Sequence, residues 1–165
     1  MERLWSPWRM AYVTGTRSDP GCIFCQALDI PSQASLVVYR GDRAFVILNL
    51  YPYNNGHLMV VPRRHIAALA EAEREELHEL MELTRRAEIA LTEAYTPHGL
   101  NVGLNLGRAA GAGVADHLHI HLVPRWNGDT NFMTVVSDVR VLPESLEESA
   151  ARLRPIFDRM AAART

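Results

Sequence analysis

The sequence contains no lysine, since all 17 of its basic residues are arginine. The missing lysine excludes Schiff-base chemistry and a lysine nucleophile. Neither charge is in large excess: the 19 acidic residues leave a formal net charge of −2, which argues against a nucleic-acid backbone as partner. Any covalent chemistry must therefore come from another type of side chain.

Long apolar runs are also absent. No run reaches the length that spans a membrane, and the N-terminus lacks the apolar core of a signal peptide. We therefore expect a cytoplasmic protein that has no membrane partner.

Cysteine is scarce, and the only two, Cys22 and Cys25, are separated by two residues. In a reducing compartment such a pair is more often a set of metal ligands or a redox couple than a structural disulfide. Structural zinc usually takes four ligands, and His65 together with one histidine of a later cluster could complete the set. The alternative is a pair of reduced cysteines packed in the core.

Histidine, by contrast, is concentrated in the stretch from Asp116 to Arg125, where His117, His119 and His121 alternate with apolar residues. A strand turns successive side chains to opposite faces, so the three imidazoles should share one face while the apolar residues enter the core. Such a row can supply a nucleophile, an acid and a metal ligand side by side. The alternative is a half-buried strand that is merely rich in histidine.

A loop of glycine and alanine, residues 107–113, precedes the histidines. Its glycines Gly107, Gly111 and Gly113 let the backbone approach a ligand, and amide N–H groups in such loops bind phosphate oxygens. A flexible surface loop would have the same composition, but the adjacent histidines favour phosphate chemistry. A neutral imidazole can attack phosphorus, and the resulting phosphoramidate can pass its group to water or phosphate. A neighbouring histidine can stabilise the charge that gathers on the phosphate oxygens.

The hydrophobic pattern predicts a single α+β domain over residues 1–165, built on an antiparallel sheet of about five strands. Gly41 and Asp42 should turn the first strand into the second. The strands are expected at residues 36–40, 44–50, 57–62, 100–106 and 116–125, with a further short apolar run at 133–136.

Two helices are predicted, one long helix at about residues 71–95 and a C-terminal helix at 143–163. Pro155 should kink or split the second helix. Residues 1–20 form an N-terminal arm in which two tryptophans need to be covered by the domain or by a second subunit. The apolar positions expected to face the core from the long helix are Leu77, Leu80, Met81, Thr84 and Leu91.

Residues 117–123 (His-Leu-His-Ile-His-Leu-Val) resemble the HxHxHxx signature of the histidine triad (HIT) superfamily, whose members bind nucleotides and cleave or transfer nucleotidyl groups. Residues 48–62, 97–107 and 124–132 are similar to the bacterial branch of diadenosine tetraphosphate phosphorylases, as is the opening Leu-Trp-x-Pro-Trp-Arg. The resemblance implies a HIT-like fold and a homo-oligomer, at least a dimer with a joined sheet. It also implies an enzyme that splits diadenosine polyphosphates, with inorganic phosphate or water as the acceptor.

The resemblance also implies roles for individual residues. His119 corresponds to the nucleophile, His121 lies against the phosphate oxygens, and His57 is the fourth histidine that supports the triad. Asn49 matches a position on the ribose hydroxyls, and Asn105 matches one on the phosphates or the leaving group. The residues that correspond to the adenine slot are Ile23, Phe24, Ile47, Leu50 and Met59. In members that carry structural zinc, the ligands correspond to Cys22, Cys25, His65 and His117.

Related enzymes often carry a serine or threonine in the loop before the triad, whereas this chain has Ala112 and Gly113, which leave only backbone donors. Three other functions stay open. The chain could be an adenosine phosphoramidate hydrolase of the zinc-bearing type, or a nucleotide-binding regulatory module with little turnover. It could also hold zinc at an open site formed by the three histidines together.

Overall fold

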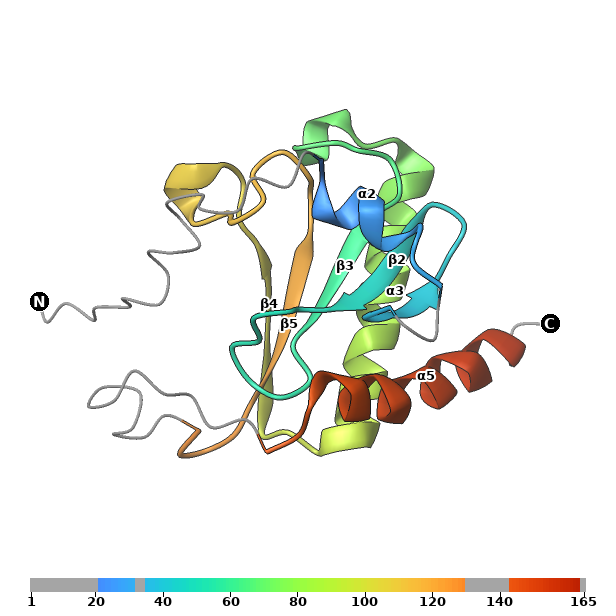
Figure 1. Ribbon diagram of the computed structural model, residues 1–165, viewed down its shortest axis with the longest axis vertical. Helices are drawn as coiled ribbons and strands as arrows, with labels where there is room; N and C mark the ends of the chain where they lie inside the picture. The colour runs from blue at the N-terminus through green and yellow to red at the C-terminus, as the bar shows by residue number, and fades with distance from the viewer. Residues whose placement is uncertain (1–20, 32–34, 130–142, 164–165) are drawn as a thin grey trace, which may run out of the picture.

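The computed structural model describes residues 21–31, 35–129 and 143–163. Within them, a five-stranded sheet has the strand order β1-β2-β3-β5-β4, and every neighbouring pair is antiparallel (Figure 1). The strands are β1 (Val37–Arg40), β2 (Ala44–Leu48), β3 (Leu58–Pro62), β4 (Gly99–Leu104) and β5 (Ile120–Arg125). The α+β class and the five strands are thus confirmed. The predicted run at 133–136 and the N-terminal arm at 1–20 lie outside the described residues.

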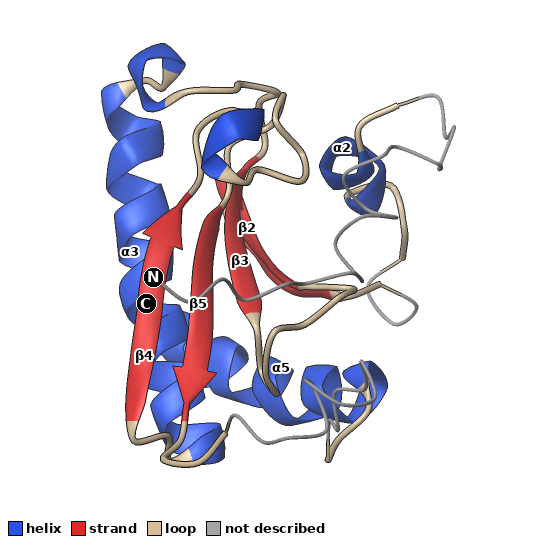
Figure 2. Cartoon of the chain, turned by 90° about the vertical axis from the view of Figure 1, so that its left-hand side faces the viewer, coloured by secondary structure: helices blue, strands red, loops and turns tan. Residues whose placement is uncertain are grey.

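Helices cover both faces of the sheet. The long helix α3 (Arg74–Tyr95) packs on one face, and the short helix α2 (Ile23–Ala27) lies on the opposite face (Figure 2). Helix α5 (Leu146–Ala162) packs against α3 and β1. Two short 3-10 helices, Leu69–Glu71 and Arg108–Ala110, belong to connecting segments. No helix among the described residues is both long enough and apolar enough to cross a membrane.

The sheet separates two groups of buried side chains. Even-numbered residues of β2, β3 and β5, such as Leu48, Leu58 and Leu122, join the larger group together with α3 and α5. Odd-numbered residues of β2 and β3 point the other way and pack with Phe24 of α2. This alternation follows from the pleat of the strands. It leaves the α2 face of the sheet for the odd-numbered histidines.

The turn between β1 and β2 occurs at the predicted Gly41–Asp42 position. Gly41 donates its N–H to the carbonyl of Ala44 at 2.9 Å, and Glu79 of α3 accepts the N–H of Arg43 at 2.9 Å. A Cβ on Gly41 would lie only 2.0 Å from the Glu79 carboxylate. The same Cβ would lie 2.8 Å from the backbone carbonyl oxygen of Ala44, which cannot move aside as the end of the Glu79 side chain can, so this turn favours glycine.

Helix α3 begins at Arg74, later than predicted, because the Glu76 carboxylate accepts the N–H of Glu73 at 2.8 Å and so caps the helix. The predicted apolar face of this helix is partly wrong. Leu77 and Met81 are exposed, with 39% and 64% of their surface accessible. Leu80, Thr84 and Leu91 are buried as predicted, and the helix also buries Leu83, Ala87 and Ala90.

The C-terminal helix begins at Leu146 because Ser145 and Glu148 form a capping box, in which each side chain accepts the other's backbone N–H. Pro155 lies inside α5 and does not split it, contrary to one of the two predicted outcomes. The residue one turn earlier, Ala151, and Pro155 are both exposed. Water can therefore satisfy the carbonyl that the proline leaves without a partner.

Candidate active site and metal centre

The predicted alternation of the histidine stretch is present. Leu118, Ile120 and Leu122 are buried in the larger core group, whereas Phe24 of α2 lies against the rings of His117 and His119, with centroids 5.4 and 5.1 Å away. The paired strand β5 begins only at Ile120, later than the predicted start. The cause is that the Leu118 N–H donates to the carbonyl of Ile66, in the segment after β3, at 2.6 Å.

His119 is held in one tautomer. Its Nδ1 lies 2.8 Å from the carbonyl oxygen of His117, and a carbonyl can only accept, so Nδ1 carries the hydrogen and Nε2 carries the lone pair. The side chain is buried, and burial lowers the pKa of the ring, which keeps it neutral at pH 7. Its ring meets that of His121 edge-on, with centroids 4.8 Å apart. His119 thus has the form that a nitrogen nucleophile requires.

His57 and His121 form a second, directional pair. The Tyr53 N–H donates to His57 Nδ1 at 3.0 Å, so the hydrogen of the His57 ring must be on Nε2. His57 Nε2 lies 2.9 Å from His121 Nδ1 and therefore donates to it. The remaining hydrogen of a neutral His121 is then on its Nε2. The donor at His57 Nδ1 thus favours one tautomer in each of the two histidines.

Asn49 lies beside this pair, at the end of β2. Its Oδ1 accepts the N–H of Tyr51 at 3.0 Å, which directs its Nδ2 toward His57 Nδ1 at 3.4 Å. The strand register also places Met59 beside His121, and Gly103 of β4 on the other side of His121. The predicted ribose position and the histidines predicted to be catalytic are therefore neighbours on one face of the sheet.

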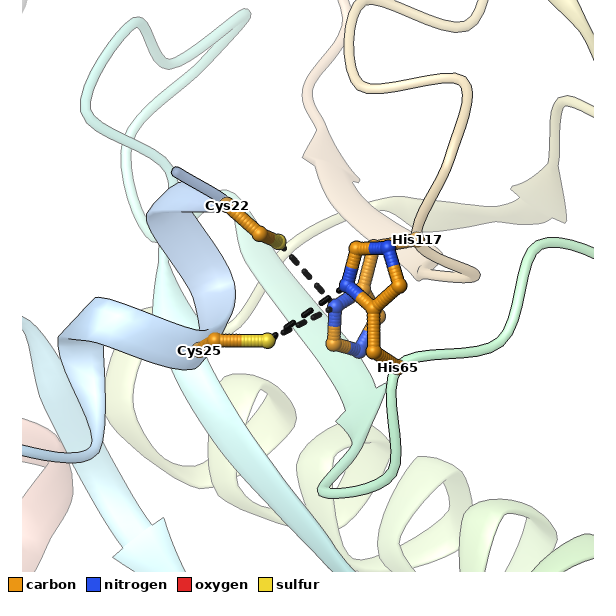
Figure 3. A group of neighbouring side chains, drawn as sticks. All are labelled: Cys22, Cys25, His65 and His117. Carbon is orange, nitrogen blue, oxygen red and sulfur yellow. Dashed lines mark hydrogen bonds between the residues drawn. The ribbon is translucent and has the colours of Figure 1, made fainter. Parts of the chain in front are cut away.

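A second cluster consists of Cys22, Cys25, His65 and His117, whose ligand atoms all lie within 4.8 Å of one another (Figure 3). His117 Nδ1 lies 3.2 Å from Cys22 Sγ and 3.7 Å from Cys25 Sγ, and His65 Nδ1 lies 3.5 Å from Cys25 Sγ. Burial raises the pKa of the Cys25 thiol, and the adjacent Cys22 raises it further. The four residues named from the sequence are thus brought together.

This cluster fits zinc. In a tetrahedral site, ordinary Zn–S and Zn–N bond lengths place sulfur and nitrogen about 3.6 Å apart, close to the distances found here. His117 Nε2 lies 2.8 Å from the carbonyl of Pro62 and donates to it, which leaves the Nδ1 lone pair directed at the thiols. Burial lowers the pKa of this ring, so it is neutral at pH 7, as a ligand must be. A metal here would be held by Cys22 and Cys25 at α2, by His65 in the segment after β3, and by His117, two residues before His119.

The geometry does not favour joint chelation by the three triad histidines. His117 turns its Nδ1 to the cysteines, whereas His119 Nδ1 is bonded to a carbonyl and His121 Nδ1 to His57. Among the residues that the structure describes, no group of metal-ligating side chains includes His119 or His121.

The glycine loop lies at the end of β4. Gly107 and Gly111 have φ values of 79° and 92°, and they flank the 3-10 turn Arg108–Ala110. Asn105 Nδ2 donates to the carbonyl of Gly111 at 3.5 Å, so the amide side chain and the loop are in contact. Gly113 is exposed, and the next residue, Val114, packs against the group of apolar side chains around Phe24. The loop therefore borders the α2 face.

The residues expected to form the adenine slot divide into two sets. Phe24, Ile47 and Met59 belong to one apolar group on the α2 face. Ile23 and Leu50 lie outside that group, with 51% and 50% of their surface exposed. The structure therefore brings three of the five together and places the other two at the surface.

One polar contact that borders the site was not predicted from the sequence. Asn54 Nδ2 donates to Asp129 Oδ2 at 2.7 Å and lies 3.0 Å from the carbonyl of Pro124. Asn54 lies in the loop between β2 and β3, and Asp129 lies in the segment that follows β5. No local pattern pairs them, because they are 75 positions apart.

Comparisons with known proteins agree with this geometry. The model of the HIT domain family matches residues 31–128. The AP-4-A phosphorylase of Mycobacterium tuberculosis H37Rv is 41% identical over 157 residues, which cover 90% of this chain and 80% of the relative.

Two solved structures share the fold. A hypothetical histidine triad nucleotide-binding protein from Sulfolobus tokodaii is 28% identical with a TM-score of 0.68, covering 84% of this chain and 93% of its own. A zinc-bound histidine triad family protein from Mycobacterium smegmatis is 29% identical with a TM-score of 0.67, and the match covers 87% of this chain and 97% of that one.

Proposed function

This chain belongs to the HIT family, and from that membership we propose that it is a nucleotidyl-transfer enzyme that cleaves diadenosine polyphosphates, diadenosine tetraphosphate above all. The observation that carries the proposal is the state of His119, whose Nδ1 is bonded to a backbone carbonyl and whose Nε2 is left as a nucleophile. The match to an AP-4-A phosphorylase, which is 41% identical and covers 90% of this chain, supports the substrate class.

The reaction proceeds in two steps. His119 Nε2 forms a bond to the α-phosphorus of the substrate, and the bond from that phosphorus to the bridging oxygen breaks, which releases ATP. An acceptor oxygen then attacks the same phosphorus and the N–P bond breaks, which returns the ring to its neutral form. Inorganic phosphate as acceptor gives ADP, and water gives AMP. The order of events is that of covalent catalysis by an imidazole.

The remaining groups bind and orient the substrate. His121 presents its Nε2 hydrogen to the phosphate oxygens because its Nδ1 is occupied by His57. Asn49 binds the ribose hydroxyls, and Asn105 contacts the phosphates or the leaving group. The backbone amides near Gly107, Gly111 and Gly113 approach the phosphate chain. The adenine base packs against Phe24, Ile47 and Met59, with Ile23 and Leu50 at the margin of the slot.

Zinc, when bound, is held by Cys22, Cys25, His65 and His117 in a structural role. The chain's own residues connect this cluster to the nucleophile, because His117 supplies both a ligand nitrogen and the carbonyl that orients His119. We propose that the metal fixes α2 and His117 and takes no part in the chemical steps.

We further propose a single domain that forms at least a homodimer. The packing of α5 against α3 and β1 supports the single domain. Strand β4 supports the dimer, since among the described strands it pairs with β5 alone and leaves one edge of the sheet open. Val102, in the middle of this strand, has 52% of its surface exposed.

Turnover of diadenosine tetraphosphate, with the products resolved, tests the proposal. We expect ATP plus ADP in the presence of inorganic phosphate and ATP plus AMP in its absence. Substrate that stays intact in both conditions, while AMP binds tightly in calorimetry, would identify a nucleotide-binding module and overturn the proposal.

A second activity is favoured by the Cys22, Cys25, His65 and His117 cluster and by the similarity to a zinc-bound family member. This is hydrolysis of adenosine phosphoramidates. The same assay with adenosine 5′-phosphoramidate separates the two activities, since a kcat/KM well above that for diadenosine tetraphosphate would assign the hydrolase.

A further inference from the structure

The segment from Asn49 to His57, which joins β2 to β3, carries several groups of the candidate site but is not itself a strand or helix. It supplies the Asn49 side chain, the Tyr53 N–H and His57. The Tyr53 N–H decides the tautomer of His57 and, through it, that of His121. The hydrogen bond from the Tyr53 N–H to His57 depends on the position of this loop, so contacts that fix the loop also fix the tautomer.

Asp129, which follows β5, holds this loop through a hydrogen bond to Asn54. Its Oδ2 accepts from Asn54 Nδ2 at 2.7 Å, and the same amide also donates to the carbonyl of Pro124 at the end of β5. Asn54 directly follows Tyr53, and its own carbonyl accepts the N–H of His57 at 3.2 Å. Asn54 is therefore tied to β5 by its side chain and to His57 by its backbone.

Asp129 is in turn fixed by three further donors. Arg125 binds both of its oxygens, with Nε 2.6 Å from Oδ2 and Nη2 2.8 Å from Oδ1, and the Trp126 N–H donates to Oδ2 at 3.2 Å. The Arg125 guanidinium holds the pKa of the Asp129 carboxyl well below its usual range, so the group stays ionised. Only 10% of the Asp129 side chain is exposed. The bidentate geometry fixes the orientation of this mostly buried carboxylate, although the Arg125 side chain is about half exposed.

We infer that Asp129 is a positioning residue for the catalytic histidines, acting through Asn54 and the Tyr53 N–H to keep His57 and His121 in single tautomers. The expected effect on the reaction rate rests on the proposed function, whereas the expected effect on the tautomers of His57 and His121 does not. The effect of the carboxylate passes through the Asn54 side chain, along the backbone to the Tyr53 N–H, and then through the hydrogen bonds to His57 and His121.

The variant D129N tests this assignment. The substitution removes the charge that holds Arg125 and leaves one acceptor oxygen where the carboxylate has two. The amide NH2 then opposes one of the Arg125 donors, so the bidentate pair is lost and the anchor of the loop is weakened. We expect kcat for diadenosine tetraphosphate to fall by about 10- to 100-fold, with a smaller change in KM, because a misplaced catalytic group costs rates of this order. In ligand-free protein, nitrogen NMR of labelled histidine should show mixed tautomers at His57 and His121.

Two further variants make the test specific. N54A breaks the same contact while leaving the Arg125–Asp129 pair intact, and it serves if D129N does not fold. The double variant should be no slower than the slower single one, because both act through one contact. E93Q is the matched control, since it removes the carboxylate of an exposed pair with Arg159 on the helical side of the molecule. It should leave both rate and tautomers unchanged.

The outcomes separate the inference from the proposed function. Single tautomers at His57 and His121 in folded D129N or N54A would overturn the inference, even if the wild-type protein cleaves diadenosine tetraphosphate. Effects that multiply in the double variant would also overturn it. Mixed tautomers in the variants, together with a wild-type protein that leaves the dinucleotide intact, would support the inference and reject the proposed function.

Discussion

His119 donates its Nδ1 hydrogen to the backbone carbonyl of His117 over 2.8 Å. This one bond joins the candidate nucleophile to a residue of the metal cluster, since the His117 side chain turns its other ring nitrogen to Cys22. Because His117 lies two residues before His119, its backbone orients His119 while its side chain faces the cysteines. The His117 ring has a partner at each nitrogen, the Pro62 carbonyl at Nε2 and Cys22 at Nδ1, so the residue that orients the candidate nucleophile is itself held on its side-chain end.

The variant H119A should abolish turnover of diadenosine tetraphosphate while nucleotide still binds. The variant lacks the only nitrogen that the proposal assigns to bond formation, whereas the apolar and amide groups around the nucleotide remain. Rates would be measured by product chromatography and binding by calorimetry with AMP. H78A is the matched control, because His78 is exposed on α3 and should tolerate the change.

A covalent label provides the direct test of the same step. Wild-type protein quenched during reaction with a labelled dinucleotide should carry one adenylyl group on the peptide that contains residue 119. Wild-type rates in H119A, or a label found elsewhere in the chain, would contradict the mechanism.

The metal cluster makes a separate prediction. Metal analysis of purified protein should find about one zinc per chain, because two thiolates and two imidazoles complete a structural site. C22S and C25S should lose the metal and unfold at lower temperature. H121A should keep the metal, since His121 is directed to His57 and not to the cysteines. Zinc that stays in C22S and C25S but leaves in H121A would instead indicate chelation by the triad.

The local pattern of the sequence was sufficient to predict much of the site. Alternation of His117, His119 and His121 with apolar residues determines which side chains share a face, because this depends only on the pleat. The number of ligands that structural zinc takes grouped Cys22 and Cys25 with His65 and one histidine of the later cluster, and the resemblance to the HIT family identified that histidine as His117. The structure brings these four residues together as that resemblance implied.

Other features depend on contacts between distant segments, which no local pattern contains. The tautomer of His57 follows from the N–H of Tyr53, and backbone N–H groups look the same in any sequence. The late start of β5 follows from the bond between Leu118 and Ile66. The exposure of Met81 depends on which side of α3 meets the sheet, and residues at helical spacing allow more than one orientation.

The open edge of β4 predicts a way to separate the subunits. V102D places a charge in the middle of an edge strand that, in the proposed dimer, would face a second copy of the chain. We expect light scattering after gel filtration to give twice the chain mass for the wild type and a smaller mass for V102D, because a buried unpaired charge opposes association. L69D, which alters an exposed leucine of a 3-10 turn, should stay dimeric. A V102D protein with unchanged mass would contradict this interface.

The pair formed by Glu76 and Arg64 predicts how stability depends on pH. Arg64 donates to both oxygens of Glu76 at 2.9 and 2.7 Å, and the Glu73 N–H donates as well. These bonds lower the pKa of Glu76 from 4.5 to about 2. A group whose pKa is lower in the folded state stabilises the protein above its unfolded pKa and loses this effect as the pH falls toward the folded value.

The variant E76Q should therefore lower the free energy of unfolding by about 1–2 kcal/mol at pH 7, a moderate value because Arg64 is half exposed and solvent screens the pair. The difference from the wild type should shrink as the pH falls from about 4.5 toward 2, where the wild-type carboxyl is also protonated. Urea unfolding followed by circular dichroism over this range measures it. E88Q, an exposed carboxylate of the same helix, should change stability by less than about 0.5 kcal/mol. A difference between E76Q and the wild type that stays constant with pH would show that the charge of Glu76 is not its cause.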